Sequence, residues 1–210
     1  MPTVSAEQIQ ARKDEILDAL ENLMKSHSFR NISMQDIADA TSFTRGSIYN
    51  YYQTREDIVL GLLKREYDSW NAALCELSPT ESTPECVAEM ICKSLEQRRF
   101  LLRLHSIGYR NIMEYIRTER LAEYQRSFYQ AMEQIKALFY TAAPTASDAD
   151  AIEFVHQFFT MLLGLDSMII ENDVLQNALH LSGIPERQHT IHSILGKFII
   201  RFCKSIEGES

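Results

Sequence analysis

The sequence predicts an all-α protein in which a three-helix N-terminal domain precedes a larger helical bundle. Three observations lead to this prediction. Apolar residues recur with a period of about 3.6 along almost every segment, and almost none of the chain alternates as a half-buried strand does. Gly and Pro are scarce, with 7 and 5 in 210 residues, and they lie mainly at expected breaks between helices. Expected helix starts also carry Ser or Thr three residues before an acid or amide, which is the spacing of a capping box.

An N-terminal domain is expected within residues 1–55. Capping patterns begin its first two helices and the connecting helix that follows, because Ser5, Ser33 and Thr54 each precede an acid or amide by three residues. The predicted helices cover residues 6–26, 33–41 and 44–51, with the connecting helix over about 55–77. The residues expected to be buried along the first helix are Ile9, Ile16, Leu20, Leu23 and Met24.

The larger domain is expected over residues 78–210, after a linker of Ser, Thr, Pro and Glu at residues 78–84. Thr83 and Pro84 have the form of an N-cap followed by Pro at the first helical position. Ser147 begins another capping box. The predicted helices lie near residues 84–96, 98–116, 118–142, 147–171, 173–181 and 186–205.

Composition limits the class of protein. Hydrophobic residues make up 45% and charged residues 24% of the chain, so a core can form. No window reaches the ~18 uncharged apolar residues of a membrane helix, and the first residues lack the basic and apolar regions of a signal peptide. We therefore expect a cytoplasmic protein with no membrane partner. The net charge of −8 argues against a broadly basic surface for nucleic acid, although it leaves room for a local one.

Metal, redox and enzymatic chemistry find little support in the sequence. The four cysteines form no CxxC pair, which favours reduced thiols in helix packing over redox sensing. His189 and His192 lie at i and i+3 on one predicted helix, a spacing that suits a metal, but a solvated or interface pair is the commoner explanation. No GxSxG, P-loop, GxGxxG or HExxH motif occurs. We expect no cofactor, no metal and no enzymatic activity.

Two short helices in tandem, supported by a longer one, form the pattern of a helix-turn-helix. The apolar anchors of the second short helix are Phe43, Ile48 and Tyr52, which are expected to pack on Met34, Ile37 and Ala38. The other side chains are hydroxyl, guanidinium and amide groups, which suit phosphates and base edges. These outward residues are Thr44, Arg45, Ser47, Tyr49 and Asn50, with Gly46 allowing the helix to approach DNA closely.

Local charge supports a DNA-facing surface in this segment. Arg45 and Arg55 are the only charged residues in the stretch 41–55, so the stretch is positive although the protein is acidic. Arg55 lies beside Thr54, at a helix N-terminus whose amides can also hold a phosphate. Ser33, which caps the first short helix, is a second phosphate candidate.

These segments closely resemble the TetR family of bacterial repressors, and the match covers about residues 9–60. The matching stretches are Ser33-Met34-Gln35-Asp36-Ile37-Ala38, Thr44-Arg45-Gly46-Ser47-Ile48-Tyr49-Asn50-Tyr51-Tyr52 and Thr54-Arg55-Glu56-Asp57-Ile58. The family pattern is roughly S/T-x-x-x-I-A, S/T-x-G-x-L/I-Y-x-x-F/Y and S/T-K-E-x-L. The resemblance implies a homodimer on a palindromic operator, with a variable C-terminal domain that binds an inducer.

The resemblance also implies roles for individual residues. Tyr49 and Arg55 would hold phosphates, and Tyr51 could reach the DNA backbone. Ordinary core packing is the alternative for all three tyrosines of the segment, and it is the role that we expect for Tyr52. A solvent-facing Arg45 with no DNA role is a further alternative. The residues that would face DNA are Thr44, Arg45, Gly46, Ser47, Tyr49 and Asn50.

The chain departs from the family pattern at three places. Ser42 stands where the family has a turn glycine, so the turn must form with a residue that disfavours positive φ. Arg55 replaces the usual lysine and can still pair with phosphate. No Lys or Arg precedes Arg12, so we expect no minor-groove contacts from an N-terminal arm.

The last two long predicted helices, over about residues 147–171 and 186–205, are apolar on more than one face. Such a helix must cover two neighbours, here its own domain and a second subunit in an intermolecular four-helix bundle. The resemblance implies the same dimer interface, and Gly164 and Gly196 would permit close helix approach. The residues in excess of one stripe are Phe154, Phe158, Phe159, Leu162, Leu163, Ile169, Ile191, Ile194, Leu195, Phe198, Ile199 and Phe202.

An effector cavity is predicted between the helices near residues 98–116, 118–142 and 147–171, which are rich in aromatic residues and Met. Such a lining suits a small apolar or amphipathic ligand, with His105 and Asp166 as polar groups. Simple core filling is the alternative for each residue. The predicted lining residues are Phe100, His105, Tyr109, Met113, Tyr124, Phe128, Phe158, Met161 and Asp166.

The predicted mechanism is a shift between two arrangements of the dimer. Without ligand, the two recognition helices lie one DNA turn apart, about 34–36 Å. The resemblance implies that ligand moves the helix from Pro84 or the helix from Arg98, and through it the connecting helix. One alternative is a TetR-like protein that binds DNA without sensing a ligand, and another is a helical enzyme or adaptor whose N-terminal helices are structural.

Overall fold

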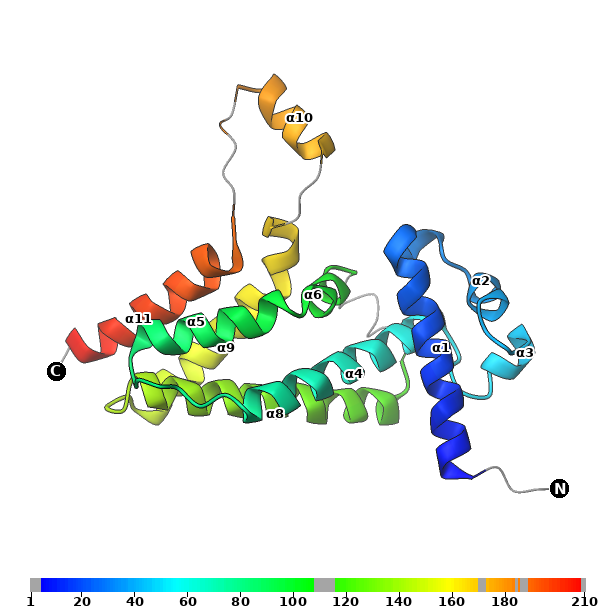
Figure 1. Cartoon of the computed structure of the whole chain (residues 1–210), viewed down its shortest axis with the longest axis horizontal. Helices are drawn as coiled ribbons and strands as arrows, with labels where there is room; N and C mark the ends of the chain where they lie inside the picture. The colour runs from blue at the N-terminus through cyan, green and yellow to red at the C-terminus, as the bar shows by residue number, and fades with distance from the viewer. Residues whose placement is uncertain (1–4, 108–115, 170–172, 184, 186–188, 209–210) are drawn as a thin grey trace. The chain divides into compact units, whose positions relative to one another are not determined.

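The computed structural model describes residues 5–107, 116–169, 173–183, 185 and 189–208 (Figure 1). Within these residues the regular structure is helical and contains no strand, which confirms the predicted all-α class. Along the helices described, apolar character never reaches the level of a membrane-spanning segment.

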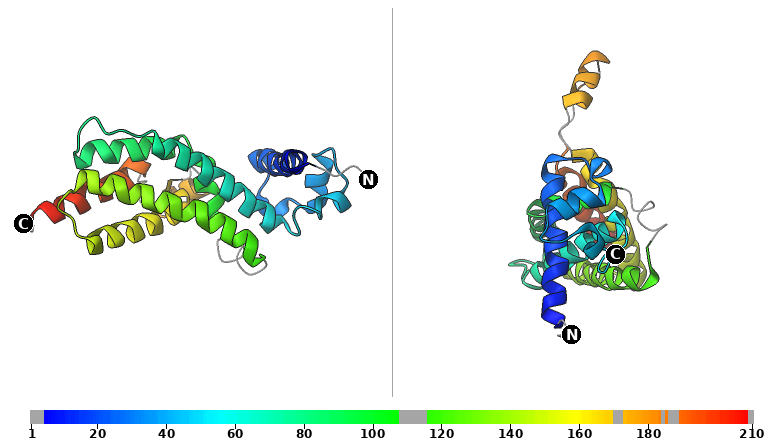
Figure 2. Two further views of the ribbon diagram at one scale, coloured as in Figure 1. Left: turned by 90° about the horizontal axis from the view of Figure 1, so that it is seen from below. Right: turned by 90° about the vertical axis from the view of Figure 1, so that its right-hand side faces the viewer.

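The chain forms two compact units. Unit 1 consists of Met1–Glu66 and Ile107–Ser127, and unit 2 consists of Tyr67–Ser106 and Phe128–Ser210. Two continuous helices, α4 (Arg55–Cys75) and α8 (Thr118–Ala142), contribute residues to both units (Figure 2). The domain boundaries expected from the sequence, 1–55 and 78–210, stay a prediction.

Capping side chains begin the helices of unit 1. Its other elements are α1 (Ala6–Ser26), the 3-10 turn η1 (Phe29–Asn31), α2 (Met34–Asp39) and α3 (Arg45–Ile48). The capping boxes predicted at Ser5 and Ser33 both form. The Thr54 hydroxyl accepts from the Asp57 N–H at 3.0 Å, but the Asp57 carboxylate accepts from the Gln53 N–H instead of closing the predicted box.

The core of unit 1 contains at least one residue from each of the helices α1, α2, α3 and α4. Ile16, Ile37, Ile48 and Ile58 are fully buried. Helices α1 and α4 also pack closely at Gly61, where an added Cβ would lie 2.9 Å from Leu17 Cδ2 and 3.2 Å from the Tyr52 hydroxyl.

The expected burial of α1 is confirmed in part. Ile16, Leu20 and Met24 are buried and Leu23 is half-buried, but Ile9 is 38% exposed. The prediction for Ile9 was wrong because residues 5–12 are all exposed, so the described residues of unit 1 do not cover the first two turns of α1. Helical periodicity identifies an apolar stripe, but it does not show how far the covering elements extend.

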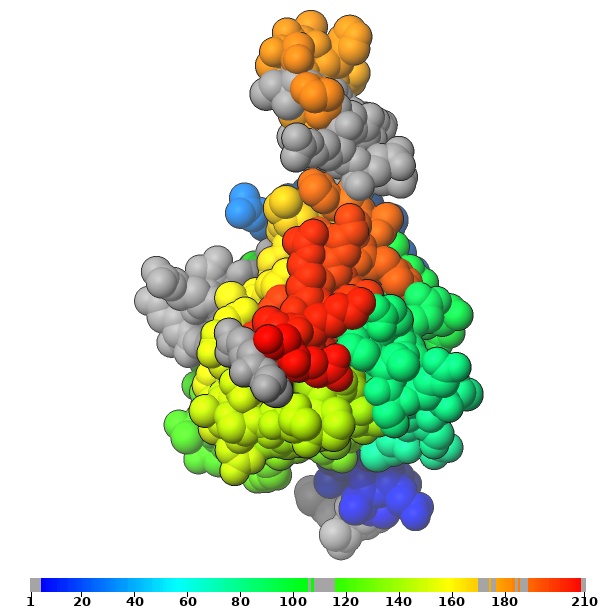
Figure 3. Space-filling view, turned by 90° about the vertical axis from the view of Figure 1, so that its left-hand side faces the viewer, coloured from blue at the N-terminus to red at the C-terminus, as the bar shows by residue number. Residues whose placement is uncertain are grey.

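Unit 2 has the remaining helices. They are α5 (Pro84–Glu96), α6 (Arg99–Ser106), α9 (Asp148–Ile169), α10 (Asp173–Leu181), the π-helical turn η2 (His192–Gly196) and α11 (Lys197–Gly208). The predicted caps form here too, because Thr83 accepts from the Cys86 N–H and Ser147 exchanges hydrogen bonds with Asp150. Helix α11 lies at the surface of this unit, between α5 and α9 (Figure 3).

Aromatic side chains form part of the core of unit 2, beside buried Leu, Ile and Val residues. The ring of Phe154 on α9 lies 4.4 Å from Phe139 and 5.5 Å from Phe198, centroid to centroid. Trp70 is fully buried, and its indole N–H donates to Ser94 Oγ at 3.1 Å. Most of the apolar excess on α9 and α11 is therefore used within one chain.

The last helical segment begins later than predicted. Residues 186–188 lie outside the described part of the chain, but His189 and Thr190 are described and are not helical. Thr190 and Ser193 exchange backbone-to-hydroxyl hydrogen bonds of 2.8 and 3.0 Å, which place an N-cap at Thr190.

Helix α6 ends at Ser106, before the end of the predicted helix 98–116. Residues 108–115 of that predicted helix lie outside the described residues.

Candidate nucleic-acid interface

The apolar side of α3 is anchored in the core of unit 1. Ile48 is fully buried and Tyr52 is 3% exposed, while Phe43 is half-buried. Their expected partners on α2, residues Met34, Ile37 and Ala38, are buried as well, and α2 packs against α3. The predicted burial of Ile48 and Tyr52 is confirmed, and so is the packing of α2 against α3, whereas Phe43 is covered only in part.

Helix α3 is shorter than the predicted range 44–51. Thr44 is its N-cap, with Oγ1 accepting from the Ser47 N–H at 3.3 Å, and the helix itself covers Arg45–Ile48. After it the chain tightens, because the N–H groups of Asn50 and Tyr51 donate to carbonyls three residues earlier rather than four.

The outward side of α3 holds a preformed pair of polar side chains. Arg45 Nε and Nη2 donate to the Tyr49 hydroxyl at 3.3 and 3.1 Å, and the guanidinium lies 5.8 Å from the centroid of the same ring. Tyr49 is 41% exposed. Of the other predicted DNA-facing residues, Thr44, Gly46 and Asn50 are exposed and Ser47 is half-buried. We call the six residues Thr44–Ser47, Tyr49 and Asn50 the recognition surface.

The predicted phosphate-binding residues beside this surface already have partners within unit 1. Arg55 Nη1 donates to the carbonyls of Ile32 and Phe29, and the guanidinium lies 5.0 Å from the Phe29 ring centroid. The Ser33 hydroxyl donates to the Asp36 carboxylate at 2.7 Å. Hydrogen bonds from the Ser33 backbone and side chain lower the pKa of Asp36 below its ordinary value. Ser33 thus caps the N-terminus of α2, and Arg55, the first residue of α4, bonds to the chain that leads into α2.

Tyr51 lies between two elements of unit 1. Its hydroxyl accepts from Arg12 Nη1 at 3.1 Å, and its ring is 6.4 Å from Phe43. The Arg12 guanidinium also lies 5.8 Å from the Phe43 ring centroid. This role of Arg12 could not be predicted from the sequence, since no local pattern joins residues so far apart in the chain.

The turn before α3 forms without left-handed backbone. Among the described residues only Gly183 has a positive φ, so Ser42 adopts an ordinary conformation. The Ser42 N–H donates to the Glu15 carboxylate of α1 at 2.5 Å. A hydrogen bond from the first helix therefore supports the turn in which the family pattern has glycine.

A second set of predicted residues gathers in unit 2 around Tyr67. The Tyr67 hydroxyl lies 2.8 Å from His105 Nε2, and its ring centroid is 5.4 Å from that of Phe128. Phe128 in turn lies 5.1 Å from Phe159, which contacts Phe158 at 5.3 Å. The structure thus brings together the predicted residues His105, Phe128 and Phe158, through Tyr67 and Phe159, which the prediction did not include. We call these five residues the aromatic cluster.

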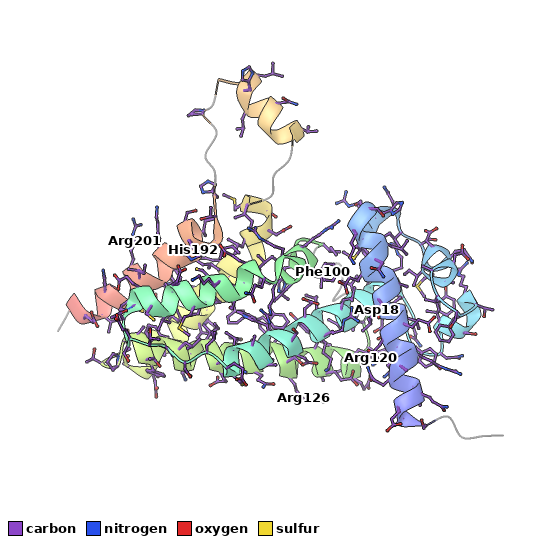
Figure 4. All side chains as sticks on the ribbon, in the orientation of Figure 1. Asp18, Phe100, Arg120, Arg126, His192 and Arg201 are labelled. Atoms are coloured by element: carbon purple, nitrogen blue, oxygen red, sulfur yellow. The ribbon has the colours of Figure 1, made fainter. Side chains whose placement is uncertain are left out.

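The other predicted effector residues have varied positions. Tyr124 is buried, while Phe100, Met161 and Asp166 are half-buried. Phe100 lies on α6 (Figure 4). Tyr109 and Met113 lie outside the described residues. Membership of an effector site stays a prediction for all of these residues.

His105 is the buried polar group of the aromatic cluster. It is 5% exposed, and its Nδ1 has no hydrogen-bond partner among the residues that the structure describes. Burial lowers the pKa of His105 to about 4, so the imidazole is neutral at pH 7. A buried polar atom without a partner destabilises a protein by about 1–3 kcal/mol, and this unsatisfied nitrogen is therefore a candidate ligand contact.

The two histidines that were considered as a metal pair, His189 and His192, have different surroundings. His192 Nε2 lies 2.7 Å from the Glu89 carboxylate and its Nδ1 3.3 Å from the Glu96 carboxylate, whereas His189 is exposed. The described residues contain no group of three or more His, Cys, Asp or Glu that could hold a metal ion. The four cysteines are free thiols, and burial raises the pKa of Cys92 and of Cys203 to about 12.

The chain belongs to the TetR family of bacterial transcriptional regulators. Residues 16–62 match the family described as "Bacterial regulatory proteins, tetR family", and residues 63–204 match "Tetracyclin repressor-like, C-terminal domain". Proteins of this family are DNA-binding transcription factors rather than enzymes, and they bind operators and dimerise. The family prediction made from the motif is confirmed.

Individual relatives agree with this assignment. The chain is similar to the uncharacterized HTH-type transcriptional regulator YfiR of Bacillus subtilis (strain 168), with 28% identity over 67 residues. That match spans 32% of the chain and only 33% of the relative.

Two solved structures share the fold over most of the chain. One is a TetR-family transcriptional regulator from Bordetella parapertussis 12822, with a TM-score of 0.58, 13% identity and coverage of 91% of this chain and 93% of the other. The second is a transcriptional regulator of the TetR/AcrR family from Thermobifida fusca YX-ER1, with a TM-score of 0.56, 16% identity and coverage of 92% and 97%.

Proposed function

We propose that this regulator is a repressor that binds a palindromic operator as a homodimer and is released by a small apolar or amphipathic effector. The observation that carries the proposal is the two-sided character of α3. Its apolar side chains are buried, while hydroxyl, guanidinium and phenol groups form the outward recognition surface. Because operator DNA lies in the cytoplasm of a bacterium, the proposal places the protein there.

The recognition surface is proposed to enter the major groove, with Arg45 and Tyr49 as its main contacts. Their mutual hydrogen bonds hold the guanidinium in place before DNA binds, so less side-chain entropy is lost on binding. Ser33, Tyr51 and Arg55 are proposed to lie along the phosphates. Since they also have partners inside unit 1, changes at these residues would affect both stability and affinity.

The proposed dimer interface consists of α9 and α11. Apolar side chains stay exposed on α9, notably Ile152 at 50% and Met168 at 56%, and Phe198 and Phe202 of α11 are half-buried. Two such helices from each subunit would form a four-helix bundle. A two-fold axis through that bundle presents two recognition surfaces to a palindromic operator.

The proposed effector site is the aromatic cluster. Aromatic rings suit an apolar ligand body, and the unsatisfied Nδ1 of His105 suits one hydrogen-bonding group on that ligand. A ligand that binds better to the arrangement with misplaced recognition surfaces would lower operator affinity by shifting the population.

Operator binding can be tested after selection of bound duplexes from a random library at ~50 mM salt, where phosphate contacts are strongest. Arg45→Ala and Tyr49→Ala are each expected to weaken operator binding roughly tenfold or more, because a base or phosphate contact contributes about 1–3 kcal/mol. The exposed residue Lys25 on α1 provides the control Lys25→Ala. Unchanged affinity in both recognition variants, with the dimer intact by light scattering, would refute the assigned surface.

Effector release needs a separate test. Calorimetry of the dimer against fractionated metabolite extract should identify a ligand, and that ligand should reduce operator binding in a gel shift. A ligand that strengthens DNA binding would make the protein a co-repressor-dependent regulator instead. If no fraction binds, the alternative of a DNA-binding protein without a sensor is favoured.

A further inference from the structure

The first turn of α8 contacts the chain directly after the recognition helix. Arg120 Nη2 donates to the carbonyl oxygen of Tyr51 at 3.0 Å, and its guanidinium lies 5.5 Å from the centroid of the Tyr52 ring. All three residues belong to unit 1 although 69 positions separate Arg120 from Tyr51 in the sequence. Arg120 therefore contacts one residue that follows the recognition surface and the buried tyrosine that anchors it.

The C-terminal end of α3 needs such support. The helix has only four residues and closes in tight turns, and a helix of this length is not stable by itself in water. Carbonyl groups at a helix C-terminus lack the donors of a next turn, and a cation placed there is favourable. The Arg120 guanidinium supplies both a donor and a positive charge at this position.

Arg120 is itself held in a defined position. Its Nη1 pairs with the Glu123 carboxylate at 3.1 Å, one turn further along α8, and its side chain is only 19% exposed. A guanidinium that is fixed on one side by a carboxylate and on another by an aromatic face has little freedom to move. The Tyr51 carbonyl is thus bound to a rigid group rather than to a mobile surface side chain.

We propose that Arg120 is a positioning residue for operator binding: it fixes the C-terminal end of the recognition helix from α8 without contacting DNA itself. This inference rests on the proposed operator-binding role of the recognition surface. Loss of the contact leaves Tyr49 and Asn50 attached to an end of α3 that can fray, so Arg45 and Tyr49 are presented at variable angles. Because α8 continues into unit 2, operator affinity depends on the position of a helix that both units share.

The test compares Arg120→Gln with Arg126→Gln, which removes an exposed arginine from the same helix (Figure 4). Hydrogen exchange of the DNA-free protein should be faster for the amides of residues 49–53 in Arg120→Gln and unchanged in Arg126→Gln. Operator affinity should fall about fivefold to tenfold in Arg120→Gln, which is less than the full worth of a charge-assisted hydrogen bond because Arg120 acts on DNA only through the position of α3. Arg120→Lys, which keeps the charge but not the forked geometry, should recover part of the affinity.

Salt dependence separates positioning from direct phosphate contact. If Arg120 only positions α3, the slope of log affinity against log salt stays that of the wild type. A slope reduced by about one unit in Arg120→Gln would instead mean a phosphate contact and would overturn the inference.

Exchange rates at residues 49–53 that match the wild type would overturn it as well. The exchange measurement uses no DNA, so it tests the contact even where the wild type binds no operator and the proposed function itself fails. If Arg120→Gln does not fold, the same exchange comparison with Arg120→Lys decides the matter.

Discussion

The recognition surface of unit 1 and the aromatic cluster of unit 2 place their polar groups in opposite settings. Arg45 and Tyr49 bond to each other at the surface, whereas His105 is buried with one nitrogen paired to Tyr67 and the other unsatisfied. A change at the surface should therefore alter binding and leave stability nearly intact. A change in the cluster should alter stability first, because four of its five side chains are buried in the core and Phe128 is half-buried.

The largest expected difference is between Trp70→Ala and Tyr49→Ala. Trp70 is fully buried beside the aromatic cluster, 6.2 Å from Phe159 between ring centroids, so truncation should lower the free energy of unfolding by about 3–5 kcal/mol. Tyr49 is exposed, and its truncation should change that energy by less than about 0.5 kcal/mol. Denaturant titrations at one protein concentration measure both values, since dimer stability depends on concentration. Equal losses in the two variants would break the comparison.

A smaller effect is expected from pH. His105 has its pKa lowered by burial to about 4, whereas in the unfolded chain it takes up a proton near pH 6.5. As pH falls from 6.5 toward 4, the unfolded state binds a proton that the folded state does not, so stability is lost. The loss between pH 7 and pH 5 should be about 2 kcal/mol.

The variant His105→Gln should reduce the pH dependence of unfolding in that window. The control is His27→Gln, which removes an exposed imidazole instead of a buried one. A wild-type stability that stays constant between pH 7 and pH 5 after correction for the carboxylates would show that His105 is accessible to protons in the folded state.

An effect on stability smaller than those of Trp70→Ala and of pH, and opposite in sign, is expected at Gly46, where stability and operator binding should change in opposite directions. An added Cβ would have Thr44 Oγ1 as its nearest neighbour at 3.9 Å, so Gly46→Ala fits and should stabilise α3 by up to about 1 kcal/mol. Operator affinity should nevertheless fall, because the methyl group keeps the helix away from the DNA backbone. The control is Gly61→Ala, where the 2.9 Å approach to Leu17 predicts a loss of about 1–3 kcal/mol. Melting curves and gel shifts on the two variants test the pair, and a Gly46→Ala protein that binds as tightly as the wild type contradicts the close approach.

The sequence was sufficient for features that depend on neighbouring residues. Capping boxes at Ser5 and Ser33, the anchors Ile48 and Tyr52, and the helix starts at Pro84 and Thr118 follow from spacing over a few positions. The family motif has the same local character, which is why the recognition surface could be proposed residue by residue.

Features that depend on distant residues were missed. Arg12 and Arg120 reach Tyr51 from helices 39 and 69 residues away, and His192 meets two carboxylates of α5 across more than ninety positions. Ile9 was assigned to the core because periodicity cannot show where the covering helices end. The cluster around Tyr67 also required the fold, since its members come from four helices.

The hydrogen bonds described for the side chains of the recognition surface stay within residues 44–49. Substitutions at these positions therefore meet few constraints from the remainder of the protein. A lineage of such regulators can drift to new target sites while its scaffold is retained, and the same independence makes this short helix the natural place to reprogramme the protein for a chosen promoter.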